Sequence, residues 1–200
     1  GKSAGKQPPQ RLRQRVQTYF DPLPFFYAPL EAQATDTTRY PLNAITQRPM
    51  FMYHAWGAQN RWLRQIAARN VLYVHPDTAA RAGLADGDWA WLSSHVGRIR
   101  VQVALHAGVQ RDTVWTWNAI GKRRGSWGLA PDTPEATRGF LLNHLVSDLL
   151  PGAPGSANAD PVTGQASWFD LRVCIDRCEE QRDALAQPQF PAMADVARAH

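Results

Sequence analysis

The stretch ITQRPMFMYHAWGAQN, residues 45–60, places side chains suited to ligand binding between two regular elements. Arg48 can donate paired hydrogen bonds to a phosphate or a carbonyl, and His54 can donate to an anionic or carbonyl oxygen. Alone, Arg48 is better explained by a surface salt bridge and His54 by a buried, hydrogen-bonded histidine. A plain connector needs only about four to six residues. The presence of both residues, together with Thr46, in one over-long connector therefore favours ligand binding.

A second segment, TWNAIGKRRGSWG, follows a strand with Asn118 and then carries the basic triplet Lys122–Arg124. It matches neither the G-x-x-x-x-G-K-[ST] nor the G-x-G-x-x-G phosphate pattern. A solvated basic loop and a contact with an acidic subunit or nucleic acid explain it equally well.

Two further segments place amides where a ligand could lie. Asn143 and His144 lie inside the apolar run GFLLNHLVSDLL, so each needs a partner if buried. That partner is either an internal hydrogen bond or, for Asn143, the edge of a heterocycle. Gln165 and Ser167 lie in the turn-rich run NADPVTGQASWFD, which is a loop that could point them at a ligand.

We identify no catalytic residue and no metal ligand in the sequence. Ser93, Ser94 and His95 are adjacent, and neighbouring residues of a strand point to opposite faces. Cys174 and Cys178 are four apart, which is not the C-x-x-C spacing of a redox or zinc motif, so we expect free thiols in a reducing compartment. The chain is therefore predicted to be a ligand-binding domain that does not catalyse a reaction on its own.

The composition favours a polyanionic partner without choosing one. The chain has 200 residues, a formal net charge of +5 and a pI near 9.6, which suits nucleic acid, a phosphate-bearing cofactor or an acidic protein. No run approaches the roughly 18 apolar residues of a membrane span, so we expect no direct membrane insertion. The first residues resemble a linker, and we expect the chain to be a fragment of a longer polypeptide.

The elements that must position these residues are mostly short strands. The alternation of apolar and polar residues, with most strand tryptophans in the phase assigned to the core, predicts a closed barrel of about six strands with short crossover helices. The predicted elements are strands over 40–46, 70–76, 112–119 and 168–176, a hairpin over 86–105, and helices over 58–68, 76–84 and 136–150.

We predict three parts in the chain. Residues 1–38 are a linker and an extended aromatic arm, because prolines interrupt the cluster YFDPLPFFYAPL and so many aromatic side chains should lie over a neighbouring surface. Residues 39–176 form the barrel. Residues 177–200 form a polar helical C-terminal tail.

Five blocks resemble, in the same order, the C-terminal domain of DMSO reductase-family molybdoenzymes. They are YPLNAITQRPMFMYHAWGAQNRWL, ARAGLADGDWAWLSSHVGRIRVQV, TVWTWNAIGKRRGSW, FLLNHLVSDLLP and DPVTGQASWFDLRV. Within that family the sequence is most similar to catalytic subunits of membrane-associated sulfite dehydrogenases and their polysulfide and thiosulfate reductase relatives.

The resemblance implies a mainly β fold, a six-stranded double-psi β-barrel of the aspartate decarboxylase-like kind. It also implies that the barrel covers the pterin side of a molybdenum cofactor, bis(molybdopterin guanine dinucleotide). The positions carried over as cofactor-binding are Thr46, Arg48, His54, Asn60, Asn143 and Gln165. Pterin edges offer donors and acceptors that suit Asn, Gln and His, and pyrophosphates attract Arg.

The family's iron–sulfur cysteines and molybdenum ligand lie in an N-terminal region absent here. We therefore expect an oxidoreductase part that is inactive alone, joined to the remaining domains, to an iron–sulfur electron-transfer subunit, and to a membrane anchor subunit. We expect the substrate to be a small sulfur oxyanion or a similar compound, and the resemblance does not say which one. The expected location is the cytoplasmic face of the membrane rather than the periplasmic face.

The alternative is a free-standing basic β-barrel that binds nucleic acid or a protein partner through its basic loops and exposed tryptophans. Steeply salt-dependent binding to single-stranded nucleic acid would favour it. The core-facing phase of the tryptophans and the wide separation of the basic clusters argue against it, so no nucleic acid is expected.

Overall fold

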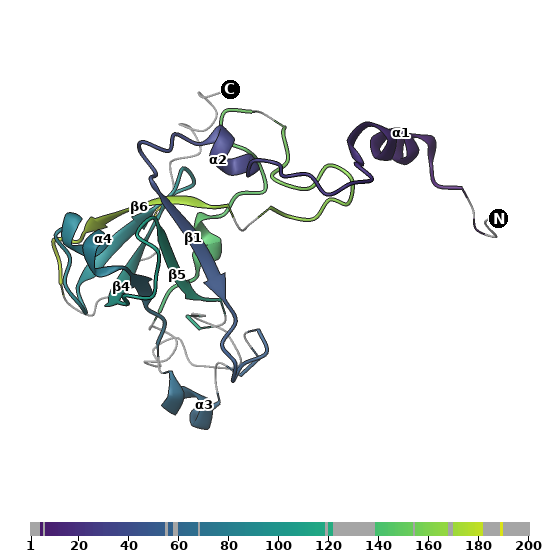
Figure 1. Cartoon of the computed structure of the whole chain (residues 1–200). Coiled ribbons are helices and arrows are strands. Elements are labelled where there is room, and N and C mark those ends of the chain that lie inside the picture. The colour runs from purple at the N-terminus through teal and green to yellow at the C-terminus, as the bar shows by residue number, and fades with distance from the viewer. Residues whose placement is uncertain are drawn as a thin grey trace.

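Six short strands close into a barrel in the order β1-β5-β2-β4-β3-β6 (Figure 1). The strands are β1 (Leu42–Gln47), β2 (Leu72–Val74), β3 (Trp89–Ser93), β4 (Arg98–Leu105), β5 (Thr113–Trp117) and β6 (Arg172–Arg177). The computed structural model describes residues 5, 7–54, 56–57, 60–67, 69–118, 120–121, 139–153, 155–167, 170–181 and 189. The prediction of a mainly β chain with a closed barrel is confirmed.

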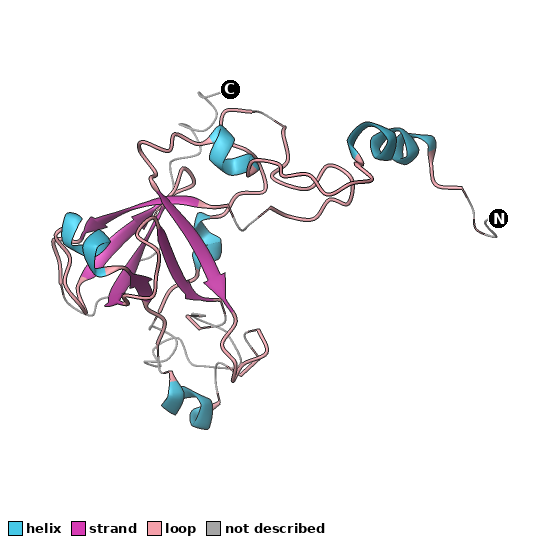
Figure 2. Ribbon diagram, in the orientation of Figure 1, coloured by secondary structure: helices cyan, strands magenta, loops and turns pink. Residues whose placement is uncertain are grey.

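The parallel pairing of neighbouring strands explains the long connectors between them. β1 pairs in parallel with β5 and β2 with β4, whereas the other neighbours are antiparallel. A parallel pair cannot be joined by a tight turn, so the chain must cross over between its strands. The helices α3 (Arg61–Ile66) and α4 (Pro76–Arg81) lie in these crossovers, outside the barrel (Figure 2). They lie within the two predicted helices at 58–68 and 76–84.

The barrel core is aliphatic, and the prediction that the strand tryptophans face it is wrong. In β3 and β5 the fully buried residues are Ala90, Leu92, Val114 and Thr116, and the tryptophans between them are only partly buried. A six-stranded barrel is too narrow for indole rings, so small and branched side chains fill it. The tryptophans lie on the outer face.

An aromatic cluster covers part of that outer face. The Tyr73 and Trp115 rings are stacked with centroids 3.9 Å apart, and Trp117 meets Trp115 edge-on at 4.8 Å. Each ring therefore shields part of its neighbour from water without entering the barrel.

The predicted helix at 136–150 is also wrong over its described part. Only a four-residue 3-10 helix, η2 (Leu142–Leu145), forms there. Gly139 has a positive φ of 84° and the flanking Leu141 is extended. The apolar side chains Leu142 and Leu145 are buried in the barrel core. Packing into the barrel has overridden the helical periodicity.

The N-terminal arm contains two helices that the prediction of a linker and an extended arm did not include. α1 (Gln10–Tyr19) follows Pro9, and α2 (Leu30–Ala34) follows Pro29. α1 stands away from the barrel (Figure 1). The proline-containing stretch between the helices has neither helix nor strand, as expected. Of the predicted C-terminal helical tail, residues 182–188 and 190–200 lie outside the described residues, and residues 177–181 contain no helix.

Three further features bear on function. Cys174 and Cys178 are free thiols, as predicted. Within the described ranges, no helix is long and apolar enough to cross a membrane. Among the same residues, no three His, Cys, Asp or Glu side chains are grouped to hold a metal ion.

Candidate functional site

The candidate site lies at the edge where β1 and β5 end. Because the two strands are parallel, Gln47 pairs with Trp117 and their connectors leave the barrel together. The backbone N–H of Asn118 donates to the Gln47 carbonyl at 2.9 Å, which extends the pairing one residue further. The long connector after β1 and the segment after β5 therefore start side by side, and the connector leads to α3 (Figure 1).

A small apolar cluster holds the connector against this edge. Met52 and Ile120 are buried there, and Phe51, Leu63 and Trp117 pack against them. The cluster joins the connector, α3 and the segment after β5. The connector is thus packed against the barrel edge at Phe51 and Met52.

The structure brings Thr46, Arg48 and His54 into this edge and the connector that leaves it. Thr46 lies in β1 and is partly buried, whereas Arg48 directly after the strand is exposed. His54 is exposed, has a φ of 49°, and meets the Tyr53 ring edge-on with centroids 4.8 Å apart. A left-handed backbone is uncommon outside glycine and is concentrated at functional positions. These three residues offer hydroxyl, guanidinium and imidazole groups on one end of the barrel.

Asn60 has a clear structural role. Its side-chain oxygen accepts from the backbone N–H groups of Trp62 at 2.9 Å and Leu63 at 3.3 Å. It is the N-cap of α3, and it satisfies donors that the short helix leaves open. Neither of these hydrogen bonds uses its Nδ2, so the predicted cofactor contact stays a prediction.

A buried asparagine that the sequence reasoning did not single out holds the edge together. Asn70 is 2% exposed. Its Nδ2 donates to the carbonyls of Trp117 and Phe140, and its Oδ1 accepts from the Thr116 hydroxyl and the Trp117 N–H. The amide thereby joins β5 to the chain segment that returns at residue 139. No spacing pattern signalled this role; only the position of Asn70 before an apolar strand hinted at burial.

Two glycines allow the chain to cross itself beside Asn70. A Cβ on Gly121, whose φ is +114°, would lie 2.2 Å from the Phe140 carbonyl oxygen. A Cβ on Gly139 would lie 2.9 Å from the Gly121 Cα. The backbones are therefore too close for any side chain here. Residues 122–138, including the basic triplet, lie outside the described residues, but both ends of that segment meet at this crossing.

Asn118 supplies an unsatisfied acceptor at the same edge. Its Oδ1 is buried and has no hydrogen-bond partner among the described residues. A buried amide oxygen without a donor is costly, and most such atoms in native proteins find a partner. A ligand with an N–H or O–H group would supply that partner.

The other two predicted residues lie apart from the connector. Asn143 is exposed on η2. Gln165 is exposed in a segment that folds back on itself, with Ala159 paired to Ala166. That segment extends toward α1, away from α3 (Figure 1). The described residues do not bring Gln165 to the edge at β1 and β5.

A second polar cluster lies at the opposite end of β1, around Glu31 of α2. Glu31 is 1% exposed, accepts from the Arg172 N–H at 3.1 Å and from Asn158 Nδ2 at 3.2 Å, and donates its own N–H to Asp170 at 2.9 Å. Burial raises the pKa of Glu31 to about 7, the nearby Asp170 charge adds to this, and the hydrogen bonds from Arg172 and Asn158 oppose it. His95 Nδ1 lies 3.8 Å from the carboxylate, and burial lowers the pKa of His95.

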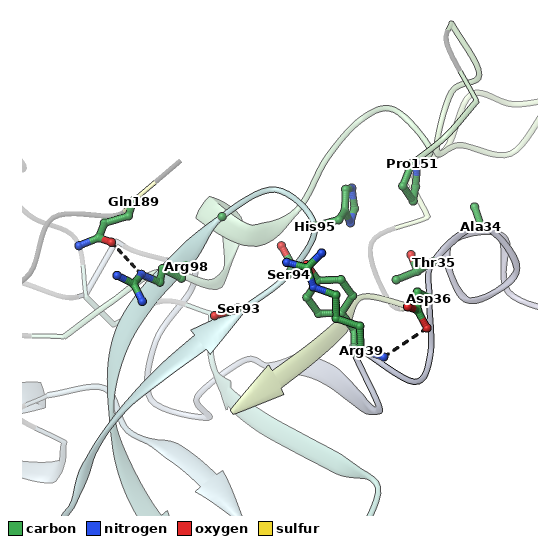
Figure 3. A pocket seen from close by; sticks show the side chains of 12 residues that line it. Ala34, Thr35, Asp36, Arg39, Ser93, Ser94, His95, Arg98, Pro151 and Gln189 are labelled. Atoms are coloured by element: carbon green, nitrogen blue, oxygen red, sulfur yellow. Dashed lines mark hydrogen bonds between the residues drawn. The ribbon is translucent and has the colours of Figure 1, made fainter. Parts of the chain in front are cut away.

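A pocket of about 640 Å³ opens beside this cluster (Figure 3). Thr35, Arg39, His95 and Arg98 are among its lining residues, and Gln189 accepts from Arg98 at 2.7 Å. Ser94, next to His95, is buried and donates to the Leu145 carbonyl instead of meeting the imidazole. The adjacent serine and histidine therefore form no nucleophile–base pair.

Comparisons with known proteins identify the family of the chain. A family model described as "Molydopterin dinucleotide binding domain" matches residues 42–159, which contain the long connector, Asn118 and Asn143. The chain is 55% identical over 196 residues to a sulfite dehydrogenase subunit of Allochromatium vinosum, a match that covers 96% of this chain and 20% of that protein.

A second relative and a solved structure extend the comparison. The chain is 29% identical over 85 residues to the thiosulfate reductase molybdopterin-containing subunit of Salmonella typhimurium, covering 42% of this chain and 11% of that protein. The structure of acetylene hydratase from Pelobacter acetylenicus has the same fold, with a TM-score of 0.62 at 22% identity over 81% of this chain and 22% of that one. The chain thus spans about a fifth or less of the length of these curated relatives.

Proposed function

The chain belongs to the molybdopterin dinucleotide-binding domain family, and from that premise we propose that it covers the pterin side of bis(molybdopterin guanine dinucleotide) in a longer catalytic subunit. Membership of the family supports a molybdopterin cofactor. The presence of two dinucleotides, the residues that contact them and the iron–sulfur cluster of a preceding region are parts of the proposal.

The observation that carries this proposal is the unsatisfied Oδ1 of Asn118 at the edge where β1 and β5 end. A pterin ring presents N–H groups along one edge, and such a group is the donor that this oxygen lacks. The close backbone crossing at Gly121 and Gly139 fixes the path of the chain at this edge. The hydrogen-bonding side chains at this edge fit the proposed cofactor.

Each residue of the edge would then have a specific binding task. Arg48 is exposed and free to fork onto a pyrophosphate, and His54 can donate to an anionic oxygen. Thr46 offers a hydroxyl from the end of β1. Asn143 and Gln165 remain proposed contacts, and Gln165 requires that its segment meet the cofactor from another side.

The bound cofactor supplies the redox chemistry through molybdenum, and the domain holds and orients it. We assign no catalytic residue and no metal ligand to this chain. Asn70, Gly121 and Gly139 hold the binding edge in place, and the cluster around Met52 and Ile120 keeps the connector against it.

The relatives support a sulfur oxyanion as the substrate class, because one belongs to a sulfite dehydrogenase and another to a thiosulfate reductase. The first relative is one subunit of its enzyme, which supports further subunits in the assembly. We propose that the partners are an iron–sulfur electron-transfer subunit, and also a membrane anchor subunit, with the complex on the cytoplasmic face of the membrane.

The decisive experiment uses the full-length parent subunit purified from its host. We expect about one molybdenum and about two GMP released by acid per chain, as a bis-dinucleotide cofactor requires. Asn118→Ala and Arg48→Ala should lower both contents, whereas Gln110→Ala, an exposed residue outside the site, should leave them unchanged. Absence of both molybdenum and GMP from a folded parent would reject the proposal. It would favour a basic binding module, which salt-dependent binding to single-stranded nucleic acid would then test.

A further inference from the structure

The aromatic arm, residues 19–27, exposes an unusual amount of apolar surface. Its exposed side chains, with the fraction exposed, are Tyr19 56%, Phe20 62%, Leu23 65%, Phe25 58%, Phe26 88% and Tyr27 64%. Soluble proteins rarely leave contiguous apolar patches of this kind uncovered unless another molecule binds there.

The arm is held at its C-terminal end, and at its N-terminal end α1 lies beside the segment 157–167. On the C-terminal side, the buried Glu31 joins α2 to Arg172 and Asn158. On the N-terminal side, Leu12 and Val16 of α1 and Val162 of the segment 157–167 line a common groove. Within the arm, the Tyr27 hydroxyl donates to Asp21 at 2.7 Å. The exposed rings therefore lie on a loop whose backbone runs between α2 and α1 (Figure 1).

The charge beside the arm restricts what can cover it. α1 has Arg11, Arg13 and Arg15, all exposed, and no acidic residue. Two copies of the chain packed arm to arm would bring these positive helices together, which is unfavourable. An apolar surface with an acidic border would complement both the rings and the arginines.

We propose that the aromatic arm is a docking surface for an apolar, acid-bordered face of the same longer catalytic subunit, in the part that this chain does not span. The inference rests on the proposed function for the existence of that subunit. The match to the sulfite dehydrogenase relative covers 96% of this chain, arm included, and only 20% of that protein, so the relative has ample additional surface in one polypeptide. Covering the rings would remove them from water and fix the barrel against its neighbour.

Hydrogen exchange on the full-length subunit tests the docking. The backbone of residues 21–29 has no helix or strand in this chain, so its amides should exchange fast unless another surface covers them. We expect slow exchange over this stretch in the full-length subunit. Fast exchange there, at the rate of an unstructured peptide of the same sequence, would overturn the proposal. Protection that arises only after addition of anionic lipid vesicles would also overturn it, in favour of a membrane surface.

A pair of variants gives the second readout. Phe25→Ser with Phe26→Ser should raise the exchange rate of the arm at least tenfold and increase proteolytic cleavage between α1 and α2. Leu149→Ser, at a side chain 48% exposed outside the arm, should change neither. Molybdenum and GMP content measured on the same samples keeps the two proposals separate: normal content with an uncovered arm rejects only the docking, and absent cofactor with a covered arm rejects only the cofactor proposal.

Discussion

At the edge where β1 and β5 end, uncharged groups hold the chain together, whereas at the other end of β1 an ionisable cluster does so. Asn70 satisfies backbone groups of two segments with one amide, and Gly121 lets them cross. Around Glu31, a buried carboxylate and a nearby imidazole join the arm to the barrel. The first arrangement is independent of pH. The second changes its energy when a proton is gained or lost, so the two ends should respond differently to mutation and to pH.

The largest effect is expected from Asn70→Ala. The change leaves the Phe140 and Trp117 carbonyls and the Trp117 N–H without their side-chain partner, and we expect a loss of about 4 kcal/mol in the free energy of unfolding, measured by urea denaturation. Asn143→Ala, at an exposed residue, should cost less than about 0.5 kcal/mol. A loss below about 1 kcal/mol for Asn70→Ala would show that water replaces the amide and that the edge is not as closed as described.

Gly121→Ala should follow, at about 3 kcal/mol, because a Cβ would meet the Phe140 carbonyl at 2.2 Å and φ is +114°. Gly152→Ala is the matched control: its φ is +70°, but nothing lies within 4 Å of the added Cβ. It should cost only about 1 kcal/mol, the penalty of the left-handed backbone. Equal losses for the two variants would refute the close crossing.

The ionisable end should lose stability as the pH rises. The pKa of Glu31 is about 7 in the folded chain against 4.5 ordinarily, so the folded state binds this proton more tightly. The resulting stability is complete below about pH 4.5 and is lost as the pH rises through about 7, by up to about 3 kcal/mol. His95 acts in the opposite sense, because its lowered pKa contributes stability that is lost as the pH falls.

Glu31→Gln isolates the carboxylate. The variant should flatten the decline of unfolding free energy between pH 5 and 8, as followed by urea denaturation at several pH values. Asn158 Oδ1 has no partner within the described part of the chain, so this amide can turn to accept from the new side-chain amide. An unchanged pH slope would mean that Glu31 stays ionised throughout and that Arg172 and Asn158 outweigh burial.

The smallest effect is expected at Asn60, and it separates two roles. Asn60→Ala removes the N-cap of α3 and should cost about 1 kcal/mol, whereas Asn60→Asp keeps the accepting oxygen and should cost less. Cofactor content of the full-length subunit provides the second readout. If Asn60 also donates to the cofactor, Asn60→Asp should recover the stability lost in Asn60→Ala but not the cofactor content. If Asn60 is only an N-cap, Asn60→Asp should recover both.

Local patterns in the sequence were enough to predict the closed barrel, the helix over 76–84, and the over-long connector that contains Arg48 and His54. Each of these depends on neighbours a few residues away: strand alternation, a proline at a helix start, a glycine with positive φ. The match to the family then agreed with the connector as part of a molybdopterin dinucleotide-binding domain.

Contacts between distant parts of the chain decided the rest. Whether Trp89 and Trp115 face inward depends on the width of the closed barrel, which no single strand contains. The helical pattern around Leu142 was overridden because its side chains fill that barrel. Asn70 and Glu31 are ordinary polar residues in sequence, and their roles arise only where segments 47 to 141 residues apart meet and exclude water.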